Sequence, residues 1–171
     1  MACSHCGRCR CHEHAEPVCS VSDALQKKRP WVLSALARTC GMTEMDAAHG
    51  LPEEMRVFAP ASAFEKIWKG ITQWAHATFI SQQGGFGMKF SGNIPEGRMI
   101  NGIYHFSGTD PFGGHVRLDS LGAICFLTLP FMGKETCSVQ FFDREGHAMF
   151  AVHVGKVDGG LCPVSRDGFF P

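Results

Sequence analysis

The sequence lacks an excess of charge of either sign, and it lacks any long apolar run. Its 16 basic and 16 acidic side chains cancel, so no global field attracts nucleic acid or an acidic membrane surface. No apolar run approaches the roughly 20 residues that a membrane-spanning helix needs. Residues 1–16 are polar and contain no apolar stretch of signal-peptide type. We therefore expect a cytoplasmic protein that neither binds nucleic acid nor inserts into a membrane.

Familiar catalytic patterns are also missing. The sequence contains no serine-nucleophile motif, no phosphate-cradling glycine loop, no His-Glu-x-x-His motif and no dinucleotide fingerprint. The acidic pair Glu53 and Glu54 follows Pro52 and is typical of a solvated helix end. We assign no catalytic residue and expect the protein not to be an enzyme.

The 171 residues, 44% of them hydrophobic, suffice for one domain with a buried core and modest extensions. Residues 1–20 form a Cys/His-rich extension that cannot build a core of its own without a metal. Residues 21–155 form the domain, with helices over 21–74 and a sheet over 77–155, and the clearest single-domain pattern lies in 51–155. Residues 156–171 are predicted to be a coil tail.

The helical part has recognisable boundaries. Pro30 suits a first helical turn and Gly41 suits the C-cap of that helix. Thr43 suits the N-cap of a second short helix that ends near Gly50. A longer amphipathic helix is predicted over 61–74, because its bulky apolar residues form one stripe at helical spacing: Phe64, Ile67, Trp68, Ile71 and Trp74.

From residue 77 the pattern changes to short β-rich runs, separated by Gly, Asn, Asp and Pro. The predicted strands cover 77–82, 87–91, 102–106, 115–118, 123–129, 138–142 and 148–154. Residues 143–146 predict a hairpin loop with Gly146 in the left-handed position. No helix alternates with these strands, so the sheet should be mostly antiparallel and the class α+β, with the long amphipathic helix packed against the sheet.

Thiols and imidazoles gather near the N-terminus as Cys3-x2-Cys6-x2-Cys9-x-Cys11, with three histidines interleaved. Zinc and iron–sulfur centres use such ligands, but the run lacks the fourth Cys-Pro of a ferredoxin and the second ligand pair of a structural zinc site. Weak soft-metal binding and thiols without a specific role both remain open. In a reducing cytosol, Cys125, Cys137 and Cys162 are predicted to be buried thiols or metal ligands.

Two other stretches carry candidate binding groups. Gly113 and Gly114 let the backbone approach a flat ligand, and His115 at the start of a strand could bind heme iron. The same residues also fit a turn followed by a solvated histidine. Residues 130–135 interrupt two apolar strands and offer adaptable apolar contacts and a cation, or simply a turn.

Read together, these stretches resemble the cytosolic heme-utilisation carrier family known as HutX or ChuX. The resemblance spans about two thirds of the chain, in the expected order. Its pieces are Leu51-Pro52-Glu53-Glu54-Met55-Arg56, Trp68, Trp74, Phe90-Ser91-Gly92-x-Ile94-Pro95, Gly102-x-Tyr104, Gly113-Gly114-His115, Pro130-Phe131-Met132-Gly133-Lys134-Glu135, Ser138-Val139-Gln140-Phe141-Phe142, Gly146, Met149-Phe150 and Val154-Gly155.

The resemblance implies a homodimer that holds heme as cargo in a cleft and passes it to a heme-degrading enzyme. The family's Gly-x-His motif corresponds to Gly113-Gly114-His115, which makes His115 the implied ligand of the heme iron. The implied heme-binding set also includes Phe112, Phe131 and Met132, with Arg98, Arg117 and Lys134 as cations for the propionates.

Three features depart from the family. Some members carry a second histidine in the strand after the long helix, where this chain has Gln82-Gln83. The Cys/His-rich N-terminus is not part of the family pattern, and Gly/Pro-containing coil replaces the expected C-terminal helix. We therefore interpret the chain as a heme carrier. A heme-degrading or iron-releasing enzyme and a metal-binding interaction protein acting through the N-terminal cysteines remain the alternatives.

Overall fold

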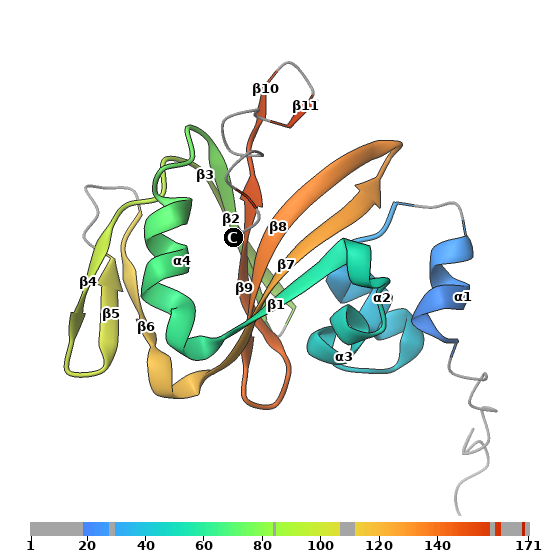
Figure 1. Ribbon diagram of the computed structural model, residues 1–171, viewed down its shortest axis with the longest axis horizontal. Coiled ribbons are helices and arrows are strands. Elements are labelled where there is room, and N and C mark those ends of the chain that lie inside the picture. The colour runs from blue at the N-terminus through green and yellow to red at the C-terminus, as the bar shows by residue number, and fades with distance from the viewer. Residues whose placement is uncertain are drawn as a thin grey trace, which may run out of the picture.

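A computed structural model of the protein describes residues 19–27, 30–83, 85–106, 112–157, 160–161 and 169. Its centre is a six-stranded antiparallel sheet in the order β1-β7-β8-β9-β2-β3 (Figure 1). These strands are β1 (Arg56–Pro60), β2 (Ala77–Gln83), β3 (Phe86–Gly92), β7 (Leu121–Phe131), β8 (Lys134–Asp143) and β9 (Ala148–Val154). The predicted α+β class with a large antiparallel sheet is confirmed.

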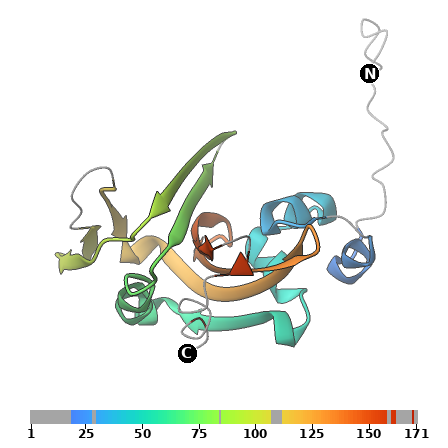
Figure 2. The same ribbon diagram turned by 90° about the horizontal axis from the view of Figure 1, so that it is seen from above.

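A smaller antiparallel sheet has the order β4-β5-β6. Its strands are β4 (Gly97–Ile100), β5 (Ile103–Phe106) and β6 (Gly114–Arg117). The helices are α1 (Val21–Gln26), α2 (Leu33–Cys40), α3 (Glu44–His49) and α4 (Phe64–Ile71), with 3-10 turns at Glu53–Met55, Ala61–Ala63 and Leu118–Ser120. Figure 2 shows α1–α3 at one end of the molecule and the small sheet at the other. No described helix is both long and apolar enough to cross a bilayer.

The large sheet is covered on both faces, and alternation along β7 separates the two cores. Ile124 and Phe126 point to the face that packs on α4 and the small sheet. Cys125 and Leu127 point to the opposite face, where α1, α2 and α3 pack. A strand covered on both faces reads as a continuous apolar run rather than an alternating one, which is why residues 123–129 are apolar almost throughout.

Helix α4 joins the two sheets through one aromatic cluster. All members of the predicted stripe are buried except the half-buried Ile67. The helix is shorter than the predicted 61–74, because residues 61–63 form a 3-10 turn and Trp74 follows the end of α4. The indole of Trp68 lies 4.5 Å, centroid to centroid, from the ring of Phe106 in β5. Its Nε1–H donates to the carbonyl oxygen of Pro95 at 3.0 Å. This contact therefore anchors the chain entering β4, as well as β5, to the core.

The short N-terminal helices follow most of the predicted boundaries. Gly41 caps α2 with φ 64°, and the Thr43 side chain accepts a hydrogen bond from the backbone N–H of Asp46 in α3. The prediction for Pro30 is wrong, because α2 begins three residues later, at Leu33.

Other sequence predictions also need correction. Residues 56–60 lie within the range expected to be helical but form β1, and β4 is an additional strand. Both are short outer strands with a Pro or Gly at one end, so their patterns are weak. Residues 156–157 and 160–161, predicted as coil, pair as β10 (Lys156–Val157) and β11 (Gly160–Leu161). The other strand predictions are confirmed, 148–154 with the predicted ends and the rest with shifted ends.

Phe169, which also lies in the predicted coil tail, is fully buried. Its ring centroid lies 6.1 Å from Trp74 and 5.5 Å from Phe126. The tail therefore supplies one aromatic side chain to the α4 core.

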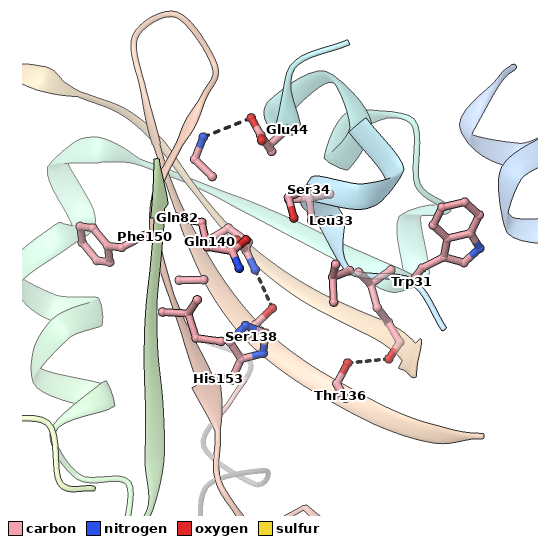
Figure 3. A pocket seen from close by; sticks show the side chains of 15 residues that line it. Trp31, Leu33, Ser34, Glu44, Gln82, Thr136, Ser138, Gln140, Phe150 and His153 are labelled. Atoms are coloured by element: carbon pink, nitrogen blue, oxygen red, sulfur yellow. Dashed lines mark hydrogen bonds between the residues drawn. The ribbon is translucent and has the colours of Figure 1, made fainter. Parts of the chain in front are cut away.

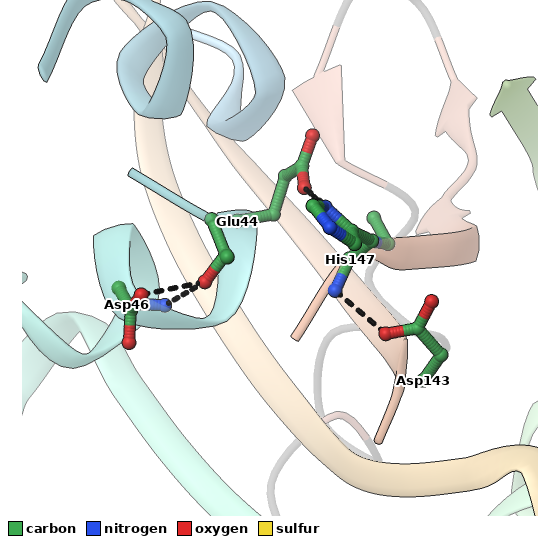
Figure 4. A network of polar contacts seen from close by, with 6 residues as sticks. Glu44, Asp46, Asp143 and His147 are labelled. Carbon is green, nitrogen blue, oxygen red and sulfur yellow. Dashed lines mark hydrogen bonds and ion pairs between the residues drawn. The ribbon is translucent and has the colours of Figure 1, made fainter. Parts of the chain in front are cut away.

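The β8–β9 hairpin docks on α3 through polar contacts (Figure 4). His147 Nδ1 lies 3.7 Å from Glu44 Oε2, and the backbone N–H of Met45 donates to the carbonyl oxygen of Gly146 at 3.0 Å. Within the hairpin, the His147 backbone N–H donates to Asp143 Oδ1 at 2.8 Å. Gly146 has φ 90°, and a Cβ there would lie 2.9 Å from Thr43 Oγ1. The predicted left-handed position of Gly146 is confirmed, and the close approach of α3 is a second reason for glycine there.

Candidate functional site

A cavity of about 460 Å³ lies between the large sheet and strand β6 of the small sheet. Its size is within the usual range of small-molecule sites. Five phenylalanine rings line it, because strands β2, β3, β5 and β9 and the segment before β6 each contribute one: Phe79, Phe90, Phe106, Phe150 and Phe112, with Met88 and Met149 beside them. Such a wall suits a large, flat, apolar ligand.

Phe112 is the centre of this wall. Its ring centroid lies 5.0 Å from Phe79, 5.0 Å from Phe90 and 5.5 Å from Phe106. Aromatic pairs at these separations pack favourably, and Phe112 is buried. Phe112 thus fixes the start of β6 against both sheets, and with it the residues that follow directly.

Those residues are the Gly-Gly-His motif, and all three line the cavity. A Cβ at Gly113 would meet no heavy atom within 4 Å in the described part of the chain, so the backbone there is open to a flat ligand. His115 is exposed, whereas its neighbour Val116 is buried in the core. Because side chains alternate along a strand, the His115 imidazole lies on the outer face of β6, at the rim of the cavity.

The outer face of the small sheet carries a row of three nitrogen-bearing side chains. Register pairs Arg98 of β4 with His105 of β5, and His105 with His115 of β6. The two imidazole centroids are 5.9 Å apart. The backbone of Arg98 lies two strands away from that of His115, which is about 10 Å at the spacing of adjacent strands. The row brings one predicted cation to the His115 face and adds a second histidine.

Arg117 also lines the cavity, but it has a partner. Its Nε donates to Asp119 Oδ1 at 3.1 Å, and a second bond joins Nη2 to Oδ2. This hydrogen-bonded pair raises the pKa of Arg117 and lowers the pKa of Asp119. Both side chains are more than half exposed, so the pair is available to rearrange around a carboxylate ligand.

The other three candidates lie elsewhere. Phe131, Met132 and Lys134 belong to the β7–β8 turn. Phe131 lines a second cavity, of about 620 Å³, that is also lined by Thr78 and Ile80. These two flank Phe79 in β2 and therefore face the opposite side of the sheet. Met132 is 75% exposed at the tip of the turn. The structure does not bring this turn together with His115.

A third, smaller cavity of about 140 Å³ separates α2 from strands β8 and β9 (Figure 3). Its floor is polar, since Gln140 Nε2 donates to Ser138 Oγ at 2.9 Å and His153 lies beside them. Gln82 lines this cavity, whereas Gln83 lines the aromatic one. The two glutamines at the family's second-histidine position therefore face opposite sides of the sheet.

The metal-binding prediction for Cys3, Cys6, Cys9 and Cys11 lies outside the described residues, as does Cys162. Within the described ranges, no group of three His, Cys, Asp or Glu side chains could hold a metal ion. Cys125 and Cys137 are buried cysteines, as predicted. Burial raises the pKa of Cys125 to about 12, so it is an unreactive thiol.

Sequence reasoning included Phe112 but missed the other rings of the aromatic wall, and it did not place His105 beside His115. The rings of β2, β3 and β9 were predicted as strand residues, but nothing in a period-2 pattern tells which strands meet around one cavity. For His105 a usable signal existed, because an antiparallel pairing of 102–106 with 115–118 through the short 107–114 connection could place the two histidines opposite each other.

Comparison with known proteins adds to this geometry. The family model for haem utilisation ChuX/HutX matches residues 57–161. The chain belongs to the ChuX/HutX family. This confirms the resemblance that was found in the sequence motifs.

One relative in sequence and two solved structures illustrate what the chain is similar to. The intracellular heme transport protein HutX of Vibrio cholerae serotype O1 (strain ATCC 39315 / El Tor Inaba N16961) is 28% identical over 137 residues, 80% of this chain and 71% of that protein. The heme binding protein ChuX has TM-score 0.78 at 24% identity, over 88% of this chain and 94% of that chain. The heme degrading enzyme ChuS of Escherichia coli O157:H7 has TM-score 0.73 at 14% identity, over 88% of this chain and 46% of ChuS. The two structural similarities show a shared fold.

Proposed function

We propose that this protein is an intracellular heme carrier that binds heme as cargo in the aromatic cavity beside β6 and passes it to a heme-degrading enzyme. One observation carries the proposal: an aromatic cavity of about 460 Å³ has the Gly113-Gly114-His115 motif on its wall in a chain of the ChuX/HutX family. The name of the relative HutX, an intracellular heme transport protein, supports the same role.

The residues fit the chemistry of a carrier. The aromatic wall receives one face of the porphyrin, and the open backbone at Gly113 lets the macrocycle approach closely. His115 supplies one imidazole to the iron, as a lone histidine does in many heme proteins. Because this imidazole is exposed at the rim rather than enclosed, it can leave the iron without unfolding the core. Arg117 and Arg98 are the cations proposed for the propionates.

The proposal is tested by titrating ferric heme into the full chain and recording the visible spectrum. We expect saturation at one heme per chain with a distinct Soret band. His115→Ala should shift or abolish that band, whereas His153→Ala, on the opposite face of the sheet, should leave it unchanged. An unaltered spectrum and affinity for His115→Ala would remove His115 as the ligand, and the same titration of His105→Ala would then test its neighbour.

The enzymatic alternative has its own assay. The heme complex is incubated with a reductant in the presence of oxygen, and the spectrum is followed. If the protein is a carrier, the Soret band of its heme complex should persist over the time in which the spectrum of free heme with the same reductant changes. Conversion to a bilin spectrum with heme bound at His115 would show heme degradation instead.

The proposed homodimer is tested separately. So is the remaining alternative, a metal-binding interaction protein that acts through the N-terminal cysteines. Sedimentation of the full chain should give twice the mass of one chain, with and without heme. Deleting residues 1–20 should leave heme affinity within about twofold, because none of the cavity residues lies there. Loss of heme binding in this deletion would favour a site built on the N-terminal cysteines.

A further inference from the structure

Two cysteine sulfurs meet at the base of the helical cover, far from the aromatic cavity. Cys19 directly precedes Ser20, the N-cap of α1, and Cys40 is the last residue of α2. Their Sγ atoms are 3.6 Å apart although the residues are 21 positions apart in the chain. Cys40 is fully buried, and Cys19 is half-buried against the same core of α1–α3. Neither thiol has a role in the proposed heme site.

We propose that Cys19 and Cys40 form a reversible disulfide in the folded protein when it meets a low-molecular-weight disulfide such as oxidised glutathione. A covalent S–S bond is about 2.05 Å long, so the two sulfurs need to approach by only about 1.5 Å. Cys19 lies outside the helical turns of α1, where a small shift breaks no helical hydrogen bond of that helix. The proposal does not depend on heme binding.

The reaction takes two exchange steps. The Cys19 thiolate attacks one sulfur of the small disulfide, a mixed disulfide forms, and one small thiolate leaves. Cys40 then loses its proton to a departing thiolate, and its sulfur attacks Cys19 Sγ, which releases the second small thiol. Two protein thiols are oxidised to one disulfide, one small disulfide is reduced to two thiols, and the two protons end on those thiols.

The environment of each thiol determines its role in these two exchange steps. Burial, together with the neighbouring Cys19, raises the pKa of Cys40 to about 11, so Cys40 is protonated and protected near neutral pH. Cys19 is the more accessible sulfur and makes the first attack. Cys125 and Cys137 belong to the cores on opposite faces of the large sheet, so the sheet keeps this second pair of thiols apart.

Closing the disulfide would join residues 19 and 40 into one loop that contains α1 and all of α2. Such a cross-link removes conformational freedom from the unfolded chain and leaves the folded helices in place. It would also fix the start of α1, where the Cys/His-rich segment enters the domain, against the end of α2. The helical cover over β1, β7 and β8 would then respond to the thiol–disulfide balance.

The test uses the full chain in glutathione buffers of increasing oxidised-to-reduced ratio, followed by acid quenching, alkylation and tryptic mass mapping. Cleavage at the basic residues gives peptides 11–27, with Cys11 and Cys19, and 39–56, with Cys40. We expect these peptides to be linked with the loss of two hydrogens. Cys11→Ser should keep the link and Cys19→Ser should abolish it. Free, alkylated Cys19 and Cys40 at every ratio, or a link lost in Cys11→Ser, would overturn the proposal.

Thermal unfolding gives a second readout that does not require a buried cysteine to be replaced. Oxidised wild-type protein should melt higher than reduced protein by on the order of 5–10 °C, and Cys19→Ser should show no such difference. A repeat in the presence of a strong chelator separates disulfide from metal. The two thiols could instead be protected from alkylation without the loss of two hydrogens, and the chelator could abolish this protection. That result would mean a bound soft metal ion and would refute the disulfide.

Discussion

Replacing Trp68 with Phe tests whether one side chain of α4 anchors the sheet that carries His115. Trp68 is fully buried, stacks on Phe106 at 4.5 Å and donates its indole N–H to the carbonyl oxygen of Pro95 at 3.0 Å. Phe keeps an aromatic ring in the cluster but removes the donor and part of the ring. The variant therefore isolates the contact that links α4 to the start of β4.

The expected loss can be worked out from these contacts. Leaving the partly buried carbonyl of Pro95 without its donor costs about 1–3 kcal/mol. The smaller ring adds about 1 kcal/mol for lost packing and a residual cavity. The free energy of unfolding should fall by about 2–4 kcal/mol, which corresponds to a Tm decrease of about 5–15 °C for a chain of this size.

The assay is thermal unfolding followed by circular dichroism, with Trp74→Phe as the matched control. Trp74 is 5% exposed and contacts Phe169 from the end of the same apolar stripe, so its substitution should lower Tm by less than half as much. Trp68 does not line the cavity, and heme affinity at 20 °C should stay within about threefold. A Tm decrease no larger than that of Trp74→Phe would refute the anchoring role.

Three further predictions concern the cavity rim and the buried thiols. Gly113→Leu should weaken heme binding at least tenfold in a heme titration while Tm stays within 2 °C, because the new side chain has room in the protein but fills ligand space; unchanged affinity would move the ligand away from Gly113. Asp119→Asn removes the charged partner of Arg117 and should raise heme affinity about two- to threefold at low salt, an effect lost at high salt; no change at low salt would exclude a propionate contact. Burial raises the pKa of Cys40 from 9.0 to about 11 and that of Cys125 from 9.0 to about 12, so the unfolded chain loses these protons first. Their contribution to stability is complete below pH 9 and is lost as pH rises through 11 and then 12, and urea unfolding of Cys125→Ala should show a shallower alkaline loss than wild type.

The sequence predicted elements best where a pattern has one strong cause. The stripe of α4, the Gly41 and Thr43 caps and the Gly146 turn each follow from local geometry, and the structure has all of them. The prediction was poor for elements whose secondary structure depends on pairing with a strand distant in sequence. Strand β1 has half-buried and exposed residues only, in no alternating order, so its pairing with β7 leaves no signal in its own residues.

The candidate site divides in the same way. The Gly-Gly-His motif could be selected from the sequence because two glycines before a histidine are informative at short range. Whether this motif lies beside residues 131–134 depends on long-range contacts and could not be predicted from neighbouring residues. The structure places Phe131 on the other face of the large sheet. The aromatic wall arises only when β2, β3, β5 and β9 meet, and such long-range contacts have no local signature.

The burial of Phe169 has a practical consequence for anyone who trims this chain. The family match ends at residue 161, which makes that position a natural place to cut an expression boundary. A chain shortened there would keep every strand that the structure describes. It would leave the rings of Trp74 and Phe126 facing an empty space where the Phe169 ring had been. Shortened and full-length proteins should therefore not be treated as interchangeable when heme affinities are compared, since a weaker α4 core would appear as a weaker ligand.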